Sequence, residues 1–279
     1  MALPKGGTKL SSNGAVEMQL AGIGRVIFWE GGSLWLALIT SAGSLHFHHA
    51  VQISLPLDGN VRFRRSQSTD WNEYAGVVIA PDLPHAFDAP GQVVANILFE
   101  PESVAGRALI DRYGEFGIAS LPAQEVARLV GPIAAAYAAD AEDAQLIALA
   151  KTVIADLSGR PVTPGAADQR ILKTIEYIRT HIDDRITLAE LAAAVHISPS
   201  RLRHLFAAET GVSCKAYILW ERLNTALALG FGGTSWTEAA HAANFADSAH
   251  LSRTCRRMFG LAPTAGRIER SSLAARVLA

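Results

Sequence analysis

Arginine, histidine and serine side chains cluster in two short segments of the C-terminal third of the chain. Apolar residues follow helical spacing in both segments, which leaves the polar side chains on the opposite face. An outward arginine can donate two hydrogen bonds to a guanine edge in the major groove of DNA, and histidine can donate to the same edge. The candidate base-contacting residues are Ser200, Arg201, Arg203 and His204 in the first segment, and Ser248, Ala249, His250, Arg253 and Arg256 in the second.

A second group of chemically capable residues lies in the N-terminal third. His46 and His48 would share one face of a strand, and His85 could meet them across a barrel. Three imidazoles suit Zn, Fe, Ni or Cu, which makes His46, His48 and His85 a candidate metal site. A hydrogen-bonded cluster, or one that lines an organic ligand pocket, is the alternative. The candidate ligand-binding residues are His46, His48, Gln52, Trp71 and His85.

The arginine-bearing segments belong to a unit that occurs twice, at residues 187–211 and 235–260. Thr187 with Glu190, and Ser235 with Glu238, have the spacing of a capping box at the start of a helix. A single unit of this kind is often only a solvated helix pair. Two copies in register predict a double helix-turn-helix that reads DNA.

Each unit also carries signals for its turn and for its second helix. Ser198-Pro199 is an N-cap followed by proline at the first helical position, and Asp247 is the N-cap of the second copy. Asn244 suits the left-handed conformation of a tight turn. We therefore expect a short helix, a turn and a longer outward-facing helix in both copies.

Composition indicates a globular protein of 279 residues with 49% hydrophobic and 18% charged residues, a length that suggests two domains. The net charge of −1 is unevenly spread. Residues 169–279 hold 14 Lys and Arg against 9 Asp and Glu, whereas residues 1–168 hold 11 against 17. A basic C-terminal part suggests that only this part contacts a polyanion. No apolar run is long enough for a membrane span, and two distant cysteines favour a reducing cytoplasm.

Hydrophobic periodicity changes along the chain. Short β-rich runs punctuated by glycine and proline predict a small antiparallel barrel or sandwich, and helical spacing follows from residue 101 to 157. Residues 158–165 contain two prolines and two glycines and read as a linker, after which the chain is helical to about residue 266. The predicted strands are residues 25–29, 34–39, 51–55, 61–64, 76–79 and 93–99.

Residues 169–267 resemble the double helix-turn-helix domain of the AraC/XylS family of bacterial transcription regulators. The resemblance rests on Ser198, Leu202, Phe206, Gly211 and Tyr217, and further on Arg222-Leu223, Asn244-Phe245, Leu251-Ser-Arg253 and Phe259-Gly-Leu-Ala-Pro263. It implies a long helix from 214 to 229 that holds the two units apart, so that both recognition helices enter successive major-groove segments. By position, Ser200, Arg203 and His204, then Ala249, His250 and Arg253, match base-reading residues of the family. Residues 230–233 contain three glycines and look looser than the family pattern, and Cys255 replaces a usual phenylalanine.

The N-terminal half is similar to cupin barrels. His46-Phe-His48, Gln52 and Gly59 fit the first cupin motif, with Gln52 in place of the usual glutamate, and residues 80–85 resemble the second. The predicted fold is α+β multidomain: a cupin-like antiparallel β-barrel at about 15–100, dimerisation helices at about 101–157, a linker at 158–168 and an all-α double helix-turn-helix domain at 169–279. The helices after the barrel could equally pack onto the barrel itself.

These features together predict a sequence-specific DNA-binding transcription regulator in the cytoplasm, and not an enzyme. Its expected partners are double-stranded promoter DNA, a small-molecule or metal effector, a second copy of the chain in a homodimer and RNA polymerase, with no membrane. No bound cofactor is expected apart from the candidate divalent metal. The alternatives are a metal-dependent cupin oxygenase or isomerase with an accessory DNA-binding domain, against which Gln52 argues, and an architectural DNA binder without sequence preference.

Overall fold

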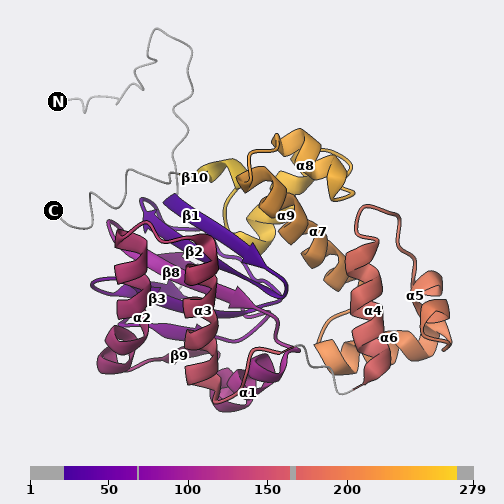
Figure 1. Cartoon of the computed structure of the whole chain (residues 1–279), viewed down its shortest axis with the longest axis horizontal. Helices are drawn as coiled ribbons and strands as arrows, with labels where there is room; N and C mark the ends of the chain where they lie inside the picture. Colours follow the sequence, from indigo (N-terminus) through magenta and orange to yellow (C-terminus); the bar gives the residue numbers. More distant parts are fainter. Residues whose placement is uncertain (1–21, 68, 164–167, 269–279) are drawn as a thin grey trace, which may run out of the picture.

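The computed structural model describes residues 22–67, 69–163 and 168–268, which form a β-rich N-terminal part and a helical C-terminal part (Figure 1). Portions of the expected barrel (15–21), linker (164–167) and C-terminal domain (269–279) lie outside these residues. Within the described ranges, no helix is both long and apolar enough to cross a membrane.

The N-terminal part contains two sheets rather than one closed barrel. The larger sheet has the strand order β10-β1-β2-β8-β3-β6-β9, and the smaller has the order β5-β4-β7. All six predicted runs are strands, and the α+β class is confirmed. The strands are β1 (Gly22–Trp29), β2 (Gly32–Ile39), β3 (Val51–Pro56), β4 (Val61–Arg64), β5 (Asn72–Tyr74), β6 (Val77–Ile79), β7 (Ala86–Asp88), β8 (Val93–Phe99), β9 (Ile118–Ser120) and β10 (Gly266–Ile268).

Apolar side chains fill the space between the two sheets. Val61 and Phe63 from β4 pack with Val77 and Ile79 from β6 and with Val94 from β8, all of them fully buried. Alternation along the strands sends their neighbours to the other face, so each central strand contributes to two cores. The segments that carry His46, His48 and His85 lead directly into β3 and β7 of this sandwich.

Helices α1 (Val104–Tyr113), α2 (Ala123–Ala138) and α3 (Asp143–Ser158) follow β8, and α2 and α3 cover the outer face of the larger sheet (Figure 1). The apolar stripes expected on them, which include Val126, Ile133, Leu146 and Ile154, belong to the same core as that sheet face. Packing onto the barrel, the second of the two alternatives, thus accounts for these stripes. One segment of this region is not helical, because β9 pairs with β6.

The C-terminal part consists of six helices within residues 168–262. They are α4 (Gln169–Thr180), α5 (Leu188–Ala194), α6 (Pro199–Thr210), α7 (Cys214–Phe231), α8 (Trp236–Ala242) and α9 (Ser248–Phe259). One core joins α4, α5, α6 and the start of α7, and a second joins the end of α7 to α8 and α9. The predicted long helix is α7, which therefore connects two separate helix-turn-helix units.

The helix starts and turns of the two units are those that the sequence predicts. Complete capping boxes are present at Thr187 and Ser235, and the side chains of Ser198 and Asp247 accept from the third amide of α6 and α9. Asn244 has a left-handed φ of 56°. The equivalent turn residue of the first unit, His196, has a φ of 54°, so the two turns share one backbone conformation.

Gly230 corrects the expectation that the segment before the second unit is loose. It lies inside α7, where a Cβ would come within 2.1 Å of the Trp236 ring. Glycine is thus needed for the close approach of α8 to α7, and this junction is packed tightly.

The two halves of the chain contact each other directly. β10, which follows α9, pairs in parallel with β1 at Gly22↔Gly266. Trp220 of α7 and Met258 and Phe259 of α9 pack against Trp35 and Leu98 of the larger sheet. The end of the second helix-turn-helix unit is therefore part of the interface with the N-terminal domain.

Candidate DNA-binding surface and histidine cluster

The expected base-contacting residues of the first unit lie on the open face of α6. Ser200, Arg201, Arg203 and His204 are exposed, whereas Leu202 and Phe206 are fully buried in the core of the unit. The proline at the first position of α6 and the Ser198 cap set where this helix begins. The structure thus leaves two arginines and a histidine free to enter a groove, and their contact with DNA stays a prediction.

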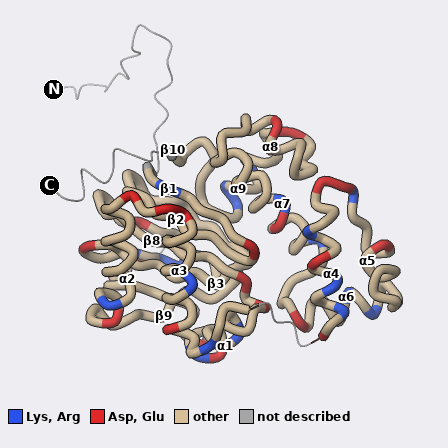
Figure 2. Tube along the Cα trace, in the orientation of Figure 1, with Lys and Arg blue, Asp and Glu red and all other residues tan. Residues whose placement is uncertain are grey.

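The second unit presents a comparable face on α9. Ala249, Arg253 and Arg256 are exposed, while Ser248 and His250 are partly buried. The His250 ring packs edge-on against Phe245 of the turn, with ring centroids 5.1 Å apart. The sequence expectation of an outward His250 therefore holds only for part of its ring. Figure 2 marks the basic residues on α6 and α9 in blue.

The opposite end of α9 is docked on the N-terminal domain. The Ser44 amide and hydroxyl both donate to the carbonyl oxygen of Gly260, at 3.1 and 2.5 Å, and the Phe47 amide donates to Arg257 at 3.4 Å. Gly260 caps α9 with a φ of +74°. The segment of residues 44–48, which carries His46 and His48, is thus bonded to the second recognition helix.

The three predicted histidines are brought together at this contact. His46 pairs with His85 through an isolated antiparallel bridge, and the ring centroids of the two are 4.4 Å apart. His48 lies 5.2 Å from His85 and 5.8 Å from His46 by the same measure. All three side chains are buried, and their potential ligand atoms lie within 4.8 Å of one another.

Burial keeps these histidines neutral. Desolvation, reinforced by the neighbouring His48, lowers the pKa of His46 to about 4. Desolvation likewise lowers the pKa of His48, and it lowers the pKa of His85 well below the ordinary value with help from His46 and His48. Neutral imidazoles are the form in which histidine binds metals.

Gln52 and Trp71, the other two predicted ligand-binding residues, differ in position. Gln52 is buried beside His48 and accepts from its Nε2 at 2.8 Å. Trp71 is not brought to the cluster, because its ring lies against the guanidinium groups of Arg64 and Arg62, at 4.6 and 5.9 Å. The structure thus places Gln52 in the histidine site and Trp71 on the smaller sheet.

A cavity of about 120 Å³ opens beside the cluster, between the two domains. His46, His48, Gln52 and Asn96 form its polar end, and the rest of its wall is largely apolar. The apolar wall comes from both halves of the chain: Val26, Trp35, Ala37, Ile39 and Leu98 from the sheet, and Phe231, Phe259 and Leu261 from the C-terminal part. A molecule bound there would contact both domains at once.

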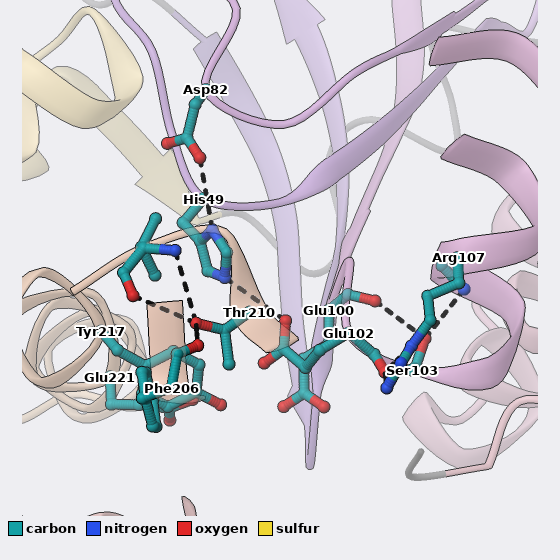
Figure 3. Close-up of polar contacts among 12 residues, drawn as sticks. His49, Asp82, Glu100, Glu102, Ser103, Arg107, Phe206, Thr210, Tyr217 and Glu221 are labelled. Carbon is teal, nitrogen blue, oxygen red and sulfur yellow. Dashed lines mark hydrogen bonds and ion pairs between the residues drawn. The ribbon is translucent and has the colours of Figure 1, made fainter. Parts of the chain in front are cut away.

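His49, which no motif of the sequence marks as a site residue, belongs to a different polar group (Figure 3). Its Nδ1 lies 3.4 Å from Asp82 and its Nε2 lies 3.3 Å from Glu102. Burial lowers the pKa of His49, but hydrogen bonds to Asp82 and Glu102 outweigh it and raise the pKa to about 9. The ring also meets Tyr217 of α7 edge-on at 5.9 Å.

Ion pairs also join the N-terminal domain to the first helix-turn-helix unit. Arg179 of α4 forms ion pairs with Glu100, Glu30 and Glu221, and Arg107 of α1 pairs with Glu209 of α6 at 3.5 Å. Each helix-turn-helix unit therefore has its own contact with the N-terminal domain, polar for the first and largely apolar for the second. Sequence spacing carries no signal for these pairs, since they join residues far apart in the chain.

Comparison with known proteins agrees with this architecture. Residues 191–267 match the family described as "Helix-turn-helix domain". The uncharacterized HTH-type transcriptional regulator YidL of Escherichia coli K12 is 38% identical over 98 residues, which are 35% of this chain and 33% of YidL. The probable transcriptional regulator LumQ of Photobacterium leiognathi is 28% identical over 89 residues, or 32% of this chain and 36% of LumQ. The chain thus spans about a third of the length of these curated relatives.

The solved structure of ToxT from Vibrio cholerae O395 is similar over both parts of the chain. It has a TM-score of 0.54 at 10% identity and covers 85% of this chain and 96% of ToxT. A ToxT structure bound to (E)-4-(8-methylnaphthalen-1-yl)but-3-enoic acid gives 0.53 at 10% identity, with 84% and 97% covered. At such low identity, this similarity shows the fold alone.

Two capped helix pairs joined by one long helix, each with an exposed arginine-bearing second helix, define a double helix-turn-helix DNA-binding domain. The relatives that this domain matches are named transcriptional regulators.

Proposed function

We propose that the protein is a sequence-specific DNA-binding transcription regulator whose N-terminal domain senses a small effector. The observation that carries the proposal is the pair of exposed helices α6 and α9, each with arginines on its open face, in a double helix-turn-helix domain. Two such helices held by α7 can each read a short stretch of base edges in the major groove.

The cavity between the domains supports the sensing role. Its walls come from the larger sheet and from residues next to α9, so a ligand in it contacts both halves of the chain. A ligand shifts an equilibrium only when it binds the two states with different affinities. A cavity lined by both domains would change when the domains move, so its ligand would distinguish the two arrangements. Its lining, which is mostly apolar with a few polar side chains, suits an effector with a polar group and an apolar body. ToxT, which shares the fold, has been crystallised with an apolar carboxylic acid.

A homodimer is part of the proposal, because regulators with two-fold symmetry read paired half-sites a whole number of helical turns apart. The apolar stripes of α2 and α3 are buried on the sheet, so the dimer contact would use the outer faces of these helices. RNA polymerase is a further proposed partner at the promoter. Sedimentation of the full-length chain at micromolar concentration tests the dimer, and a purely monomeric species would contradict it.

Selection of binding sites from random duplexes tests the function. The full-length protein should enrich half-sites that each contain two base clusters about one helical turn apart, one for each recognition helix of a protomer. A variant in which Arg203 and Arg253 are both replaced by alanine should enrich no such site. If the wild-type protein binds duplexes without enriching any sequence, it is an architectural DNA binder and the proposal is wrong.

A further inference from the structure

We propose that Arg222 and Asn244 set the spacing between the two base clusters that α6 and α9 read, because they fix the second helix-turn-helix unit to the first. Both act through the protein backbone, so they are positioning residues. The inference rests on the proposed function, since it concerns how the two recognition helices share one half-site. The rigidity of the connection can nevertheless be measured without DNA.

The two units have separate apolar cores, and α7 runs between them (Figure 1). Cys214 and Tyr217 from the first half of this helix belong to the core of the first unit, whereas Leu223 and Ala226 from its second half belong to the core of the second. A helix of 18 residues is about 27 Å long, and helices bend. A second link away from the helix axis would therefore hold the two units more firmly than α7 alone.

Hydrogen bonds on the segment between α4 and α5 provide this second link. The Arg222 guanidinium donates from Nε to the carbonyl of Ile182 at 3.4 Å and from Nη2 to the carbonyl of Asp184 at 2.6 Å. The Asn244 side-chain amide donates to the intervening carbonyl, that of Asp183, at 3.1 Å. Three successive carbonyls of the first unit are thus held by the connecting helix and by the turn of the second unit. We call these three hydrogen bonds the interunit clasp.

Arg222 is suited to this task by its place and by its shape. It lies in the middle of α7, where the helix passes from one core to the other, and it is partly buried. Burial lowers the pKa of its guanidinium, and within the described ranges it forms no ion pair with a carboxylate. The carbonyls therefore replace the water that its donors would otherwise bind. Its rigid fork of donors can span two carbonyls, which a lysine ammonium cannot do in a fixed geometry.

The turn of the first unit provides an internal comparison for Asn244. His196 occupies the equivalent position and has almost the same left-handed φ, 54° against 56°. The side chain of His196 is exposed, and among the described residues it has no hydrogen-bond partner. The left-handed backbone alone therefore does not require a side-chain amide. The contact with Asp183 does require one, and only the second unit makes it.

Contacts with the N-terminal domain also restrain the two units, but they do not replace the interunit clasp. Arg179 of α4 pairs with Glu100, and Phe259 of α9 packs on Trp35. Both contacts depend on how the domains are arranged, which is what the effector is proposed to change. The clasp lies within the C-terminal part, so it does not depend on that arrangement.

DNA spacing is sensitive to small movements of one unit relative to the other. Successive major-groove segments are about 34–36 Å apart for about 10–10.5 base pairs, so one base pair corresponds to about 3.4 Å along the axis and about 34° of rotation. A rigid connection allows both helices to reach base edges at one spacing only. A looser connection accepts neighbouring spacings but binds the correct one more weakly, because only part of the population then has the binding geometry.

Binding of the full-length protein to duplexes that carry one selected half-site tests the proposal. One base pair is inserted or removed between the two clusters, and the affinities at the three spacings are compared. The wild type should bind the altered spacings at least about 10-fold more weakly, a loss comparable to that of mismatching a base pair. Arg222→Met and Asn244→Gly should bind the selected spacing more weakly than the wild type and prefer it by less than about 3-fold.

Two controls separate positioning from a merely structural role. His196→Gly, made at the equivalent turn, should keep the wild-type spacing preference. A base change within either cluster should cost Arg222→Met and Asn244→Gly the same factor as the wild type, since the recognition helices are unaltered. A variant that is only less stable would lose affinity equally at all three spacings. Wild-type spacing preference in both clasp variants, or no preference in the wild type, would overturn the proposal.

A distance measurement without DNA separates this proposal from the proposed function. Spin labels are attached through Ala208→Cys on α6 and Thr237→Cys on α8, which are exposed positions, whereas the native Cys214 and Cys255 are buried. Double electron–electron resonance should give a broader distance distribution after Arg222→Met or Asn244→Gly, but not after His196→Gly. Broadening in a protein that enriches no DNA site contradicts only the regulator. An unchanged distribution in both clasp variants overturns the clasp, even if the protein enriches a site.

Discussion

At the scale of single residues, the chemistry of a side chain in this protein depends on its burial as much as on its type. The two cysteines illustrate this, because Cys214 and Cys255 are 6% and 1% exposed in the cores of the two helix-turn-helix units. Desolvation raises the pKa of Cys214 to about 11 and that of Cys255 to about 12. Cys255 thus behaves as a small core side chain where the family pattern has phenylalanine.

The thiols should therefore be unreactive in the folded protein. With a pKa of about 11, roughly one thiol in a thousand is ionised at pH 8, and the thiolate is the nucleophile. We expect no reaction of the native protein with a disulfide reagent such as DTNB over several minutes at pH 8. Both thiols should react at once in denaturant, which serves as the control. Rapid reaction of one equivalent in the native state would show that one of the two cores is open.

At the scale of elements, the sequence predicts most of the C-terminal domain because its signals are local. Capping boxes, N-caps and the left-handed turn residue each depend on residues within four positions of one another, and the structure contains them as expected. The sequence does not predict the strands β5, β7, β9 and β10. They have only three residues each, too few to show a period, and each exists because it pairs with another strand: β5 and β7 with β4, β9 with β6, and β10 with β1.

The turn of the second unit gives a test of these element-level arguments. Asn244 combines a left-handed backbone with a side-chain hydrogen bond to the carbonyl of Asp183 at 3.1 Å, which ties the second unit to the first. Both Asn244→Gly and Asn244→Ala remove the hydrogen bond, but only the alanine variant keeps a Cβ in the left-handed region, without the side-chain amide that makes asparagine tolerant of it. We expect Asn244→Ala to be less stable than Asn244→Gly by about 1 kcal/mol in urea unfolding. Equal stability of the two variants would mean that the backbone conformation contributes little.

At the scale of the whole molecule, the contact between the two domains could not be predicted from the sequence. The meeting of His46 with His85 follows from cupin-like spacing, but the closure of their site by Trp220 and Phe259 joins residues more than 170 positions apart. Trp71 was placed in the pocket on residue type alone, and the structure pairs it with arginines instead. Long-range docking depends on surface fit, and no periodicity of one segment encodes it.

Two capping glycines test the docking of α9. Gly211 and Gly260 end the two recognition helices with φ values of +80° and +74°, so alanine at either position carries a similar backbone cost of about 1–2 kcal/mol. Only at Gly260 would the new Cβ collide with the N-terminal domain, 2.5 Å from the Ser44 oxygen and 2.7 Å from His46 Nδ1. At Gly211 it would meet nothing within 4 Å among the described residues.

Hydrogen exchange of residues 43–48 is the measurement for this pair. Gly260→Ala should accelerate exchange in this segment, because the Ser44 and Phe47 amides donate to the end of α9. Gly211→Ala, the matched control, should leave exchange there at the wild-type rate while lowering global stability. Equal exchange in both variants would contradict the docked arrangement of the second unit.

The central claim, that α6 and α9 read base sequence, is tested most directly by comparing two affinities for single arginine variants. Arg203→Ala and Arg253→Ala are measured at one salt concentration on the selected site and on a scrambled duplex, with Arg65→Ala as an exposed-arginine control in the N-terminal domain. Each recognition-helix variant should lose about 1–3 kcal/mol, or about 5- to 150-fold, on the selected site and little on the scrambled one. Arg65→Ala should bind both duplexes like the wild type. Equal losses on the two duplexes would show phosphate contacts only and would contradict base reading by these helices.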